Sequence, residues 1–297
     1  MRAFLADSVF ALFYSTFFDD MKKIILATLT LWGVLGLASS PRAQMAEPAL
    51  QALAPVPAPD SQPRTNLEIT STFQNLTQGY GNWRDIALRG NHRLSSTNTL
   101  QGELLFADRF REKGTYASLR NTTNFDSDWF GSLGIGAGSG AFYLPKYRLE
   151  AALNKKWLPS RQLVTSIGTG YDKAPNGQTD KSLSLGAVYY FDSPWIAEGG
   201  VRWNRSDPGS VDTRQQFLAL TYGRVQSDVF TVRHGWGSEG YLAVSANFQM
   251  VNFRSQETSV SWRHWINPRT GWLLTGQQYR NPLYKRSGLG IGFFHEF

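Results

Sequence analysis

The sequence predicts an all-β protein, a transmembrane antiparallel β-barrel that follows a signal peptide and a short periplasmic linker. Three observations predict it: an export signal near the N-terminus, recurrent segments in which apolar and polar residues alternate, and a final strand that ends on an aromatic residue. Alternating segments of about ten residues are typical of membrane barrels, in which the closed sheet satisfies every backbone polar group within the lipid. A soluble β-sandwich is the alternative, because its strands also have one apolar face.

The export signal begins at Met21, which is followed by two lysines and an apolar run over residues 24–38. A basic start, about 15 apolar residues and a small-residue exit are typical of a secretory signal peptide. The run is short for a membrane helix, which needs about 20 residues. We expect residues 1–43 to be an N-terminal extension plus signal peptide, with Met21 as the true start. A longer signal or an N-terminal anchor is the alternative.

The rest of the chain divides into a linker and one barrel. Residues 44–66 are rich in proline and alanine and predict a periplasmic linker, and residues 67–297 are homogeneous in pattern and predict the barrel. The chain has no cysteine, which excludes disulfides, cysteine metal ligands and cysteine nucleophiles. We expect no cofactor and no metal. The net charge is +7, but no basic run interleaves with aromatic residues as nucleic-acid binding requires.

The final strand has one apolar face and one small or polar face. Leu289, Ile291, Phe293 and Phe297 lie on the first face, and glycines alternate with them. This pattern resembles the signal that the outer-membrane assembly machinery reads in its clients, with Phe293 and Phe297 as the signal residues. His295 departs mildly from it. The strand therefore predicts that machinery as a partner and the outer membrane of a Gram-negative bacterium as the location.

Similar alternation predicts about 15 strands. The candidate strands lie near residues 67–75, 82–93, 97–107, 114–124, 128–137, 146–156, 161–171, 181–191, 195–204, 213–223, 228–236, 240–250, 257–266, 271–280 and 287–297. Bacterial single-chain barrels have an even number of strands, so one segment is spurious or one has been missed. The loop lengths stop alternating regularly between residues 205 and 257, which places the error there. We expect about 12 to 16 strands, with 12 to 14 favoured.

The connections and the aromatic residues support a barrel. Short turns near residues 94–97, 126–128, 158–161 and 192–194 alternate with segments expected to be longer outer loops, at 107–115, 137–146, 172–181 and 206–212. Tryptophan favours the membrane–water interface. The tryptophans expected at strand ends are Trp83, Trp129, Trp157, Trp195, Trp203, Trp236, Trp262, Trp265 and Trp272.

Several of these segments resemble one family. Residues 67–76 with Gly79-Tyr80-Gly81-Asn82-Trp83, then Asp108-Arg109-Phe110, then Trp262 to Pro268 before Trp272, are together similar to the YaiO outer-membrane β-barrel family. The resemblance covers residues of about 66–297, and its evidence is the order of the motifs. It implies a single barrel in the outer membrane, with no catalytic residues to transfer.

If the apolar faces point to lipid, the opposite faces line the lumen. The predicted lumen-lining residues are Asp85, Arg89, Arg93, Glu103, Arg120, Arg148, Glu150, Glu198, Arg202 and Arg263. One interpretation is a channel for saccharide or polysaccharide, and the other is an interior filled by arginine–carboxylate pairs. We expect outer-membrane lipid and lipopolysaccharide as partners, through basic loop residues. These are Arg109, Arg111, Lys113, Lys173, Lys181, Lys285 and Arg286.

An enzyme is the alternative to a channel. His234, with Ser238 in a glycine-rich segment, is the best candidate for the base of a lipid or lipopolysaccharide hydrolase. A hairpin with flexible glycines explains the same residues. The main hypothesis is therefore a non-enzymatic barrel, with the hydrolase and a surface receptor or adhesin as alternatives.

Overall fold

The computed structural model describes the backbone of residues 65–245 and 248–297 and the side chains of 65–242 and 249–297. The expected signal peptide and the expected linker up to residue 64 lie outside the described residues, and the last two residues of that linker, Thr65 and Asn66, begin the first strand. Within them the chain forms fourteen strands. These are β1 (Thr65–Leu76), β2 (Asn82–Arg93), β3 (Asn98–Arg109), β4 (Glu112–Asn124), β5 (Trp129–Ser139), β6 (Tyr147–Trp157), β7 (Leu163–Lys173), β8 (Thr179–Tyr190), β9 (Trp195–Asp207), β10 (Val211–Gly223), β11 (Asp228–Ser245), β12 (Phe248–Asn267), β13 (Thr270–Arg280) and β14 (Lys285–Glu296).

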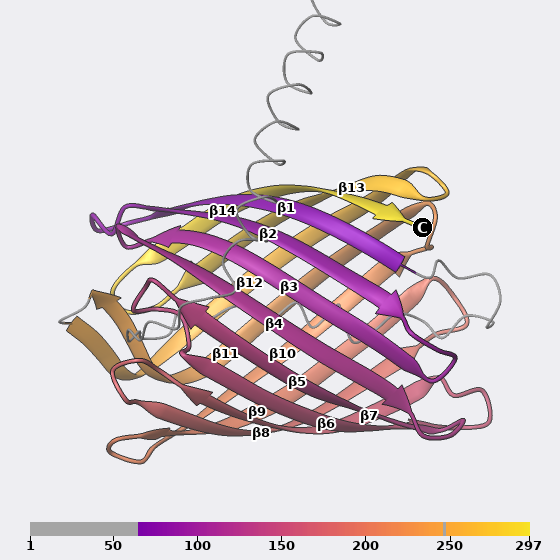
Figure 1. Cartoon of the computed structure of the whole chain (residues 1–297), viewed down its shortest axis with the longest axis horizontal. Coiled ribbons are helices and arrows are strands. Elements are labelled where there is room, and N and C mark those ends of the chain that lie inside the picture. Colours follow the sequence, from indigo (N-terminus) through magenta and orange to yellow (C-terminus); the bar gives the residue numbers. More distant parts are fainter. Residues whose placement is uncertain (1–64, 246–247) are drawn as a thin grey trace, which may run out of the picture. The chain divides into compact units, whose positions relative to one another are not determined.

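The strands make one closed barrel in which each pairs antiparallel with its neighbours in sequence (Figure 1). The last strand closes the sheet, because β14 pairs with β1 from Asn66↔Glu296 to Leu76↔Arg286. The backbone N–H of Phe297 donates to the carbonyl of Thr65 at 2.8 Å. We call the end where β1 begins and β14 ends the termini end, and the opposite end the far end. No helix among the described residues is long and apolar enough to cross a membrane.

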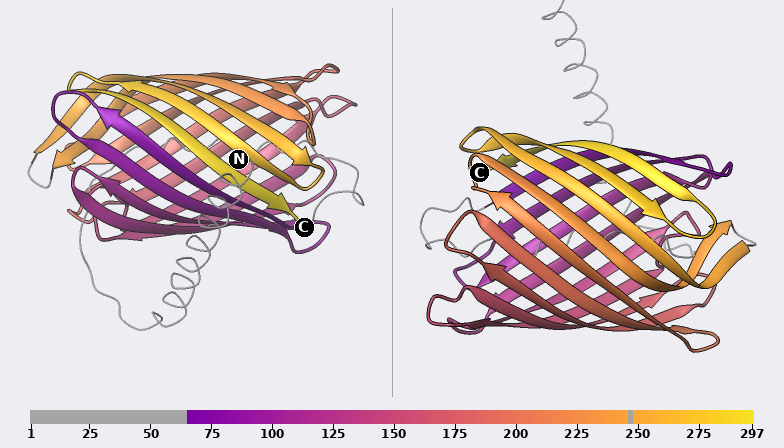
Figure 2. Two further views of the ribbon diagram at one scale, coloured as in Figure 1. Left: turned by 90° about the horizontal axis from the view of Figure 1, so that it is seen from above. Right: turned by 180° about the vertical axis from the view of Figure 1, so that it is seen from behind.

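The fourteen strands confirm the expected range of about 12 to 14, and the structure identifies which of the roughly 15 candidate segments is spurious. The candidate at 240–250 is no separate strand, because it contains the end of β11, residues 246–247 and the start of β12. The error lies between residues 205 and 257, as expected. β11 and β12 have 18 and 20 residues, and their hairpin extends beyond the neighbouring strands at the far end (Figures 1 and 2).

The expected contrast between short turns and long loops is also wrong. The far-end connections include 110–111, 140–146, 174–178 and 208–210, and they are about as short as the turns at the termini end. At the far end the strands extend beyond the segments in which apolar and polar residues alternate. Their last residues there are polar or charged but still pair in the sheet.

Apolar side chains point outward along every strand. Leu133 and Leu289 are 70% and 75% exposed, whereas the residues that alternate with them face inward and are small or polar. A sheet that closes on itself with its apolar side outside is a membrane barrel and not a sandwich.

Aromatic residues form a girdle on the outer surface at the termini end. Trp262 lies with its ring centroid 4.4 Å from Trp272 and 5.6 Å from Phe230, and Trp195 lies 4.7 Å from Tyr222. Two of the expected interface tryptophans are elsewhere: Trp83 and Trp265 point inward and are 1% and 8% exposed. The position in the two-residue alternation, and not proximity to a strand end, decides the side of the wall.

Candidate functional site: the barrel lumen

The alternation along β2, β3, β4, β6, β9 and β12 puts the charged residues on the inner face. Their neighbours in sequence, among them Leu88, Leu119 and Leu149, point outward and are 45–49% exposed. The inward residues include the predicted set Asp85, Arg89, Arg93, Glu103, Arg120, Arg148, Glu150, Glu198, Arg202 and Arg263. Their part in passage of a solute stays a prediction.

Four of the inward residues form one ionic network where β1, β2, β3 and β12 approach each other. The Arg89 Nε lies 2.5 Å from Glu103 Oε2, and its Nη1 lies 3.7 Å from Glu68. Arg263 pairs with the same Glu68 carboxylate from β12. The sequence analysis did not predict Glu68 as a lumen residue. Glu68 lies between the outward Leu67 and Ile69 on β1, so the alternation along this strand was the signal that indicated it.

Two further ion pairs join strands on the inner face of β4 to β7. The Arg120 Nη2 lies 2.7 Å from Glu150 Oε2, above Gly134, which is the register partner of both residues. Because Gly134 has no side chain, the pair can bridge from β4 to β6. The Arg148 Nε lies 2.6 Å from Asp172 Oδ1 on β7. The charges on this side of the lumen are therefore paired across strands.

Asp85 binds a buried arginine at the far end. The Arg109 Nε donates to Oδ1 at 2.9 Å and its Nη2 to Oδ2 at 2.7 Å. The guanidinium also lies over the rings of Trp83 and Tyr143, at 4.9 and 5.7 Å from their centroids. Arg109 is 6% exposed, so the expectation that it lies in an outer loop is wrong. It is the last residue of β3 and faces inward.

The loop 140–146 folds into the lumen beside this arginine. Phe142, Tyr143 and Leu144 are 6%, 0% and 1% exposed. The Tyr143 hydroxyl lies 2.9 Å from the carbonyls of Ala107 and Glu112, which anchors the loop on β3 and at the start of β4. Burial raises the pKa of Tyr143 above its ordinary value, which keeps the hydroxyl protonated.

Inward glycines make the space for this loop. A Cβ on Gly114 would lie 2.6 Å from Leu144 Cδ1, and one on Gly138 would lie 2.8 Å from Leu144 Cβ and from the Pro145 carbonyl. The glycine-rich residues 133–139 thus form most of β5 and provide room for the loop that follows.

Tyr284, in the connection 281–284, completes an aromatic cluster that we call the plug. The plug consists of Trp83, Phe110, Phe142, Tyr143 and Tyr284, whose ring centroids lie 5.0–6.5 Å apart in successive contacts. A second buried arginine, Arg286, lies over Trp83 at 4.6 Å and within 3.4 Å of Glu257. Arg286 is 3% exposed and so is also not the loop residue that was expected. The plug narrows the lumen at the far end.

The opposite inner wall is made of small residues. Gly168 pairs with Ser184, Gly170 with Ser182, and Ser166 with Gly186 across β7 and β8. The Arg202 Nη2 donates to Ser182 Oγ at 3.0 Å. On β11, the Arg233 guanidinium lies 3.9 Å over the Phe217 ring. The lumen therefore has one bulky, ion-paired wall and one hydroxyl-rich wall.

The proposed hydrolase pair does not form a dyad. His234 and Ser238 both lie on β11, and four residues of extended strand separate them by about 13 Å. The His234 Nδ1 lies 2.9 Å from Thr258 Oγ1, and the Ser238 Oγ bonds the Arg214 backbone. No group of three or more possible metal ligands occurs in the part of the chain that the structure describes.

A closed antiparallel barrel, apolar outside and polar inside, defines an outer-membrane β-barrel protein. The family described as "YaiO membrane beta barrel domain" matches residues 64–242. The chain belongs to this family, and it lies in the outer membrane of a Gram-negative bacterium. The match confirms the resemblance seen in the sequence, although that resemblance was expected to reach residue 297.

Solved structures share the architecture. The chain is similar to the "CymD monoaromatic hydrocarbon channel", with a TM-score of 0.56, 10% identity, and coverage of 89% of this chain and 95% of that one. It is also similar to a "bacterial polysaccharide outer membrane secretin", with a TM-score of 0.52, 9% identity, and coverage of 80% and 100%. At such identities the likeness shows the fold alone. No curated protein matches the chain.

Proposed function

We propose that the barrel is a non-enzymatic channel for neutral, hydroxyl-rich solutes of the saccharide class. The observation that carries the proposal is the pairing of the lumen charges: Arg89 with Glu103, Arg120 with Glu150, and Arg148 with Asp172. Pores that select ions use rings of charge of one sign. Because a wall of paired charges is nearly neutral, it offers donors and acceptors without selecting an ion.

The plug and the small-residue wall support the same class of solute. A sugar has hydroxyl groups at its edge and apolar C–H groups on its faces. Inward aromatic rings that are partly exposed, such as Phe110 and Phe217, can contact the faces, and the serines of β7 and β8 can bond the hydroxyls. The polysaccharide secretin supports only the fold, because the identity is 9%. We infer that the termini end, where β1 begins and β14 ends, faces the periplasm, because an exported chain reaches the outer membrane from the periplasmic side.

The test uses the protein from residue 44 onward, refolded in detergent and checked by heat-modifiable gel mobility. We expect proteoliposomes to swell in isotonic monosaccharide, and to swell more slowly as the sugar becomes larger. We expect the current in planar bilayers to reverse close to zero potential in a salt gradient, because paired charges do not select ions. Absence of both swelling and current, in the wild type and in a Phe142→Ala/Tyr143→Ala variant, would overturn the proposal.

Two variants separate the alternatives. A hydrolase that depends on His234 would lose lipid hydrolysis in His234→Ala, and a wild type without hydrolysis removes that alternative. A receptor acts through exposed loops, and the far-end connections 110–111 and 208–210 offer few residues for that role. Exchange of the 174–178 connection for an unrelated sequence is expected to leave swelling unchanged.

A further inference from the structure

A group of cations lies on the outer surface of the barrel near the far end. Arg214 on β10, Arg254 on β12 and Arg280 on β13 line one hollow of about 600 Å³, together with Gln216 and Gln256. All three arginine side chains are exposed. Within residues 65–242 and 249–297, none of the three forms an ion pair with a carboxylate. The hollow therefore has positive charge without a protein counter-ion.

The register brings these cations together. The backbone N–H of Arg214 donates to Ser238 Oγ at 3.0 Å, and Ser238 is the register partner of Arg254. Arg280 pairs directly with Lys285 on β14. Like charges placed opposite each other on neighbouring strands repel. A bound anion would remove this repulsion.

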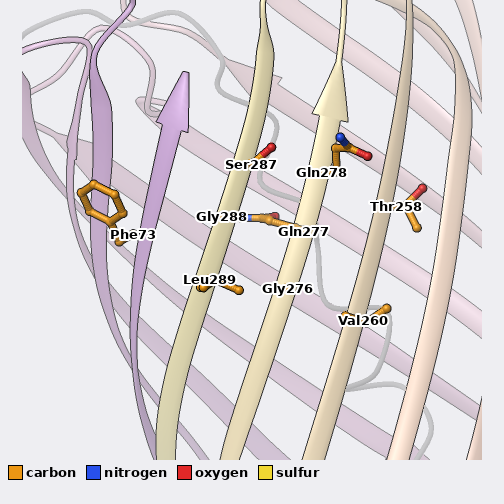
Figure 3. Close-up of a pocket in the computed structure, with 9 residues that line it drawn as sticks. All are labelled: Phe73, Thr258, Val260, Gly276, Gln277, Gln278, Ser287, Gly288 and Leu289. Carbon is orange, nitrogen blue, oxygen red and sulfur yellow. The ribbon is translucent and has the colours of Figure 1, made fainter. Parts of the chain in front are cut away.

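A second hollow lies further along the same strands toward the termini end, with Gln278 of β13 in its lining where the first has Arg280. It has a volume of about 610 Å³ and lies over Gly276, with Val260 on one side and Leu289 and Phe73 on the other (Figure 3). Val260 and Leu289 are the register partners of Gly276, which has no side chain to fill the space between them. Gln278, at the border of this hollow, is two residues from Arg280, or about 7 Å along the strand.

We propose that the two hollows form one binding site for a phosphorylated glycolipid of the outer leaflet, the lipid A part of lipopolysaccharide. Guanidinium groups bind phosphate through paired, charge-assisted hydrogen bonds, and the arginines lie where headgroups contact a barrel whose far end faces outward. The apolar hollow over Gly276 takes an acyl chain. A free phosphate would use only the first hollow, so the neighbouring apolar hollow favours the lipid.

The arginines are tested by binding of diphosphorylated lipid A to the folded barrel in detergent, measured by native mass spectrometry. Each cation near a membrane surface contributes roughly a fivefold change in affinity. We expect the R214Q/R254Q/R280Q variant to bind about a hundredfold more weakly. A matched variant at the termini end, R161Q/R224Q/R269Q, is expected to bind as the wild type does.

Two results would overturn the proposal. One is equal binding by the two triple variants, and the other is binding of inorganic pyrophosphate alone as tight as that of lipid A, which would identify a free anion as the ligand. If the triple variant does not show heat-modifiable mobility, R280Q alone is measured, with an expected fivefold loss.

The acyl part is tested separately by Gly276→Leu, which fills the second hollow. The control is Gly102→Leu, at an outward glycine of β3 where a Cβ would meet no atom closer than 3.8 Å. We expect Gly276→Leu to weaken lipid A binding severalfold and to leave pyrophosphate binding unchanged. Equal effects of the two substitutions would contradict an acyl chain in this hollow.

Discussion

Asp85 and Arg109 meet in a bidentate ion pair inside the barrel, 24 residues apart in sequence and adjacent through the pairing of β2 with β3. Their side chains are 8% and 7% exposed. The pair lies between the rings of the plug, so it joins the wall of the barrel to the inward loop.

Removing one partner of this pair is expected to destabilise the barrel. Arg109→Ala leaves the Asp85 carboxylate buried without a counter-ion, which costs about 3–5 kcal/mol. The free energy of unfolding, from denaturant titration in liposomes, measures the loss. Arg161→Ala is the control, because its pair with Asp128 is about half exposed and contributes below about 1 kcal/mol. Equal losses would show that the buried pair has no special role.

Gly138→Val is expected to expel the 140–146 loop from the lumen. The new side chain would overlap Leu144 and the Pro145 carbonyl, and the loop is easier to displace than a paired strand. Single-channel conductance should rise severalfold. Gly235→Val is the control on the opposite wall, where a Cβ would be no closer than 3.7 Å to any neighbour. Unchanged conductance in Gly138→Val would mean that the loop does not limit the current.

Glu68→Gln is expected to make the pore anion-selective. Glu68 contacts both Arg89 and Arg263. The neutral amide removes one negative charge from the lumen, so the net charge of the lumen becomes one unit more positive than in the wild type. The reversal potential in a potassium chloride gradient should shift in the direction that reports chloride permeation. Asp126→Asn, in a turn at the termini end, removes one negative charge outside the lumen and should leave the reversal potential nearly unchanged.

Alkaline pH is expected to loosen the plug. Burial raises the pKa of Tyr143 in the folded protein above its ordinary value of 10.0. The protonated Tyr143 hydroxyl therefore stabilises the inward position of the loop fully below the pKa that Tyr143 has in the unfolded chain, near about pH 10. This stabilisation is lost as the pH rises through the pKa of Tyr143 in the folded protein. Conductance should therefore increase above about pH 10. Tyr143→Phe has no hydroxyl to titrate, and an identical alkaline increase in this variant would assign the effect to another group.

Deletion of Phe297 is expected to reduce assembly more than stability. Its outward side chain is 58% exposed, and its backbone N–H bonds Thr65 where the barrel closes. We therefore expect less heat-modifiable protein in outer membranes of expressing cells and nearly normal refolding of the purified protein in detergent. Deletion of the residues before position 64 from the linker, with the signal retained, is the control for expression. Equal loss in both assays would assign Phe297 to folding itself.

The direction of a side chain depends on local alternation, which the sequence displays, whereas Trp83 and Trp265 were assigned from their position near strand ends and point inward. The predicted strand ends were less accurate. Arg109 and Arg286 were expected in loops because charged residues near turns usually lie in solvent, but β3 and β14 continue through both positions and turn them inward. β11 and β12 were divided wrongly because polar residues interrupt their apolar alternation before the hairpin.

The sequence by itself determined that the barrel segment consists of strands with one apolar and one polar or small face, since a period of two residues is a property of the extended backbone. Only the tertiary structure decided which charges meet. Glu68 and Arg263 are 195 residues apart and become partners because β14 closes on β1 and brings β12 near it. The inward position of loop 140–146 likewise could not be predicted from the local sequence. It depends on the space above Gly114 and Gly138, which lie on two different strands.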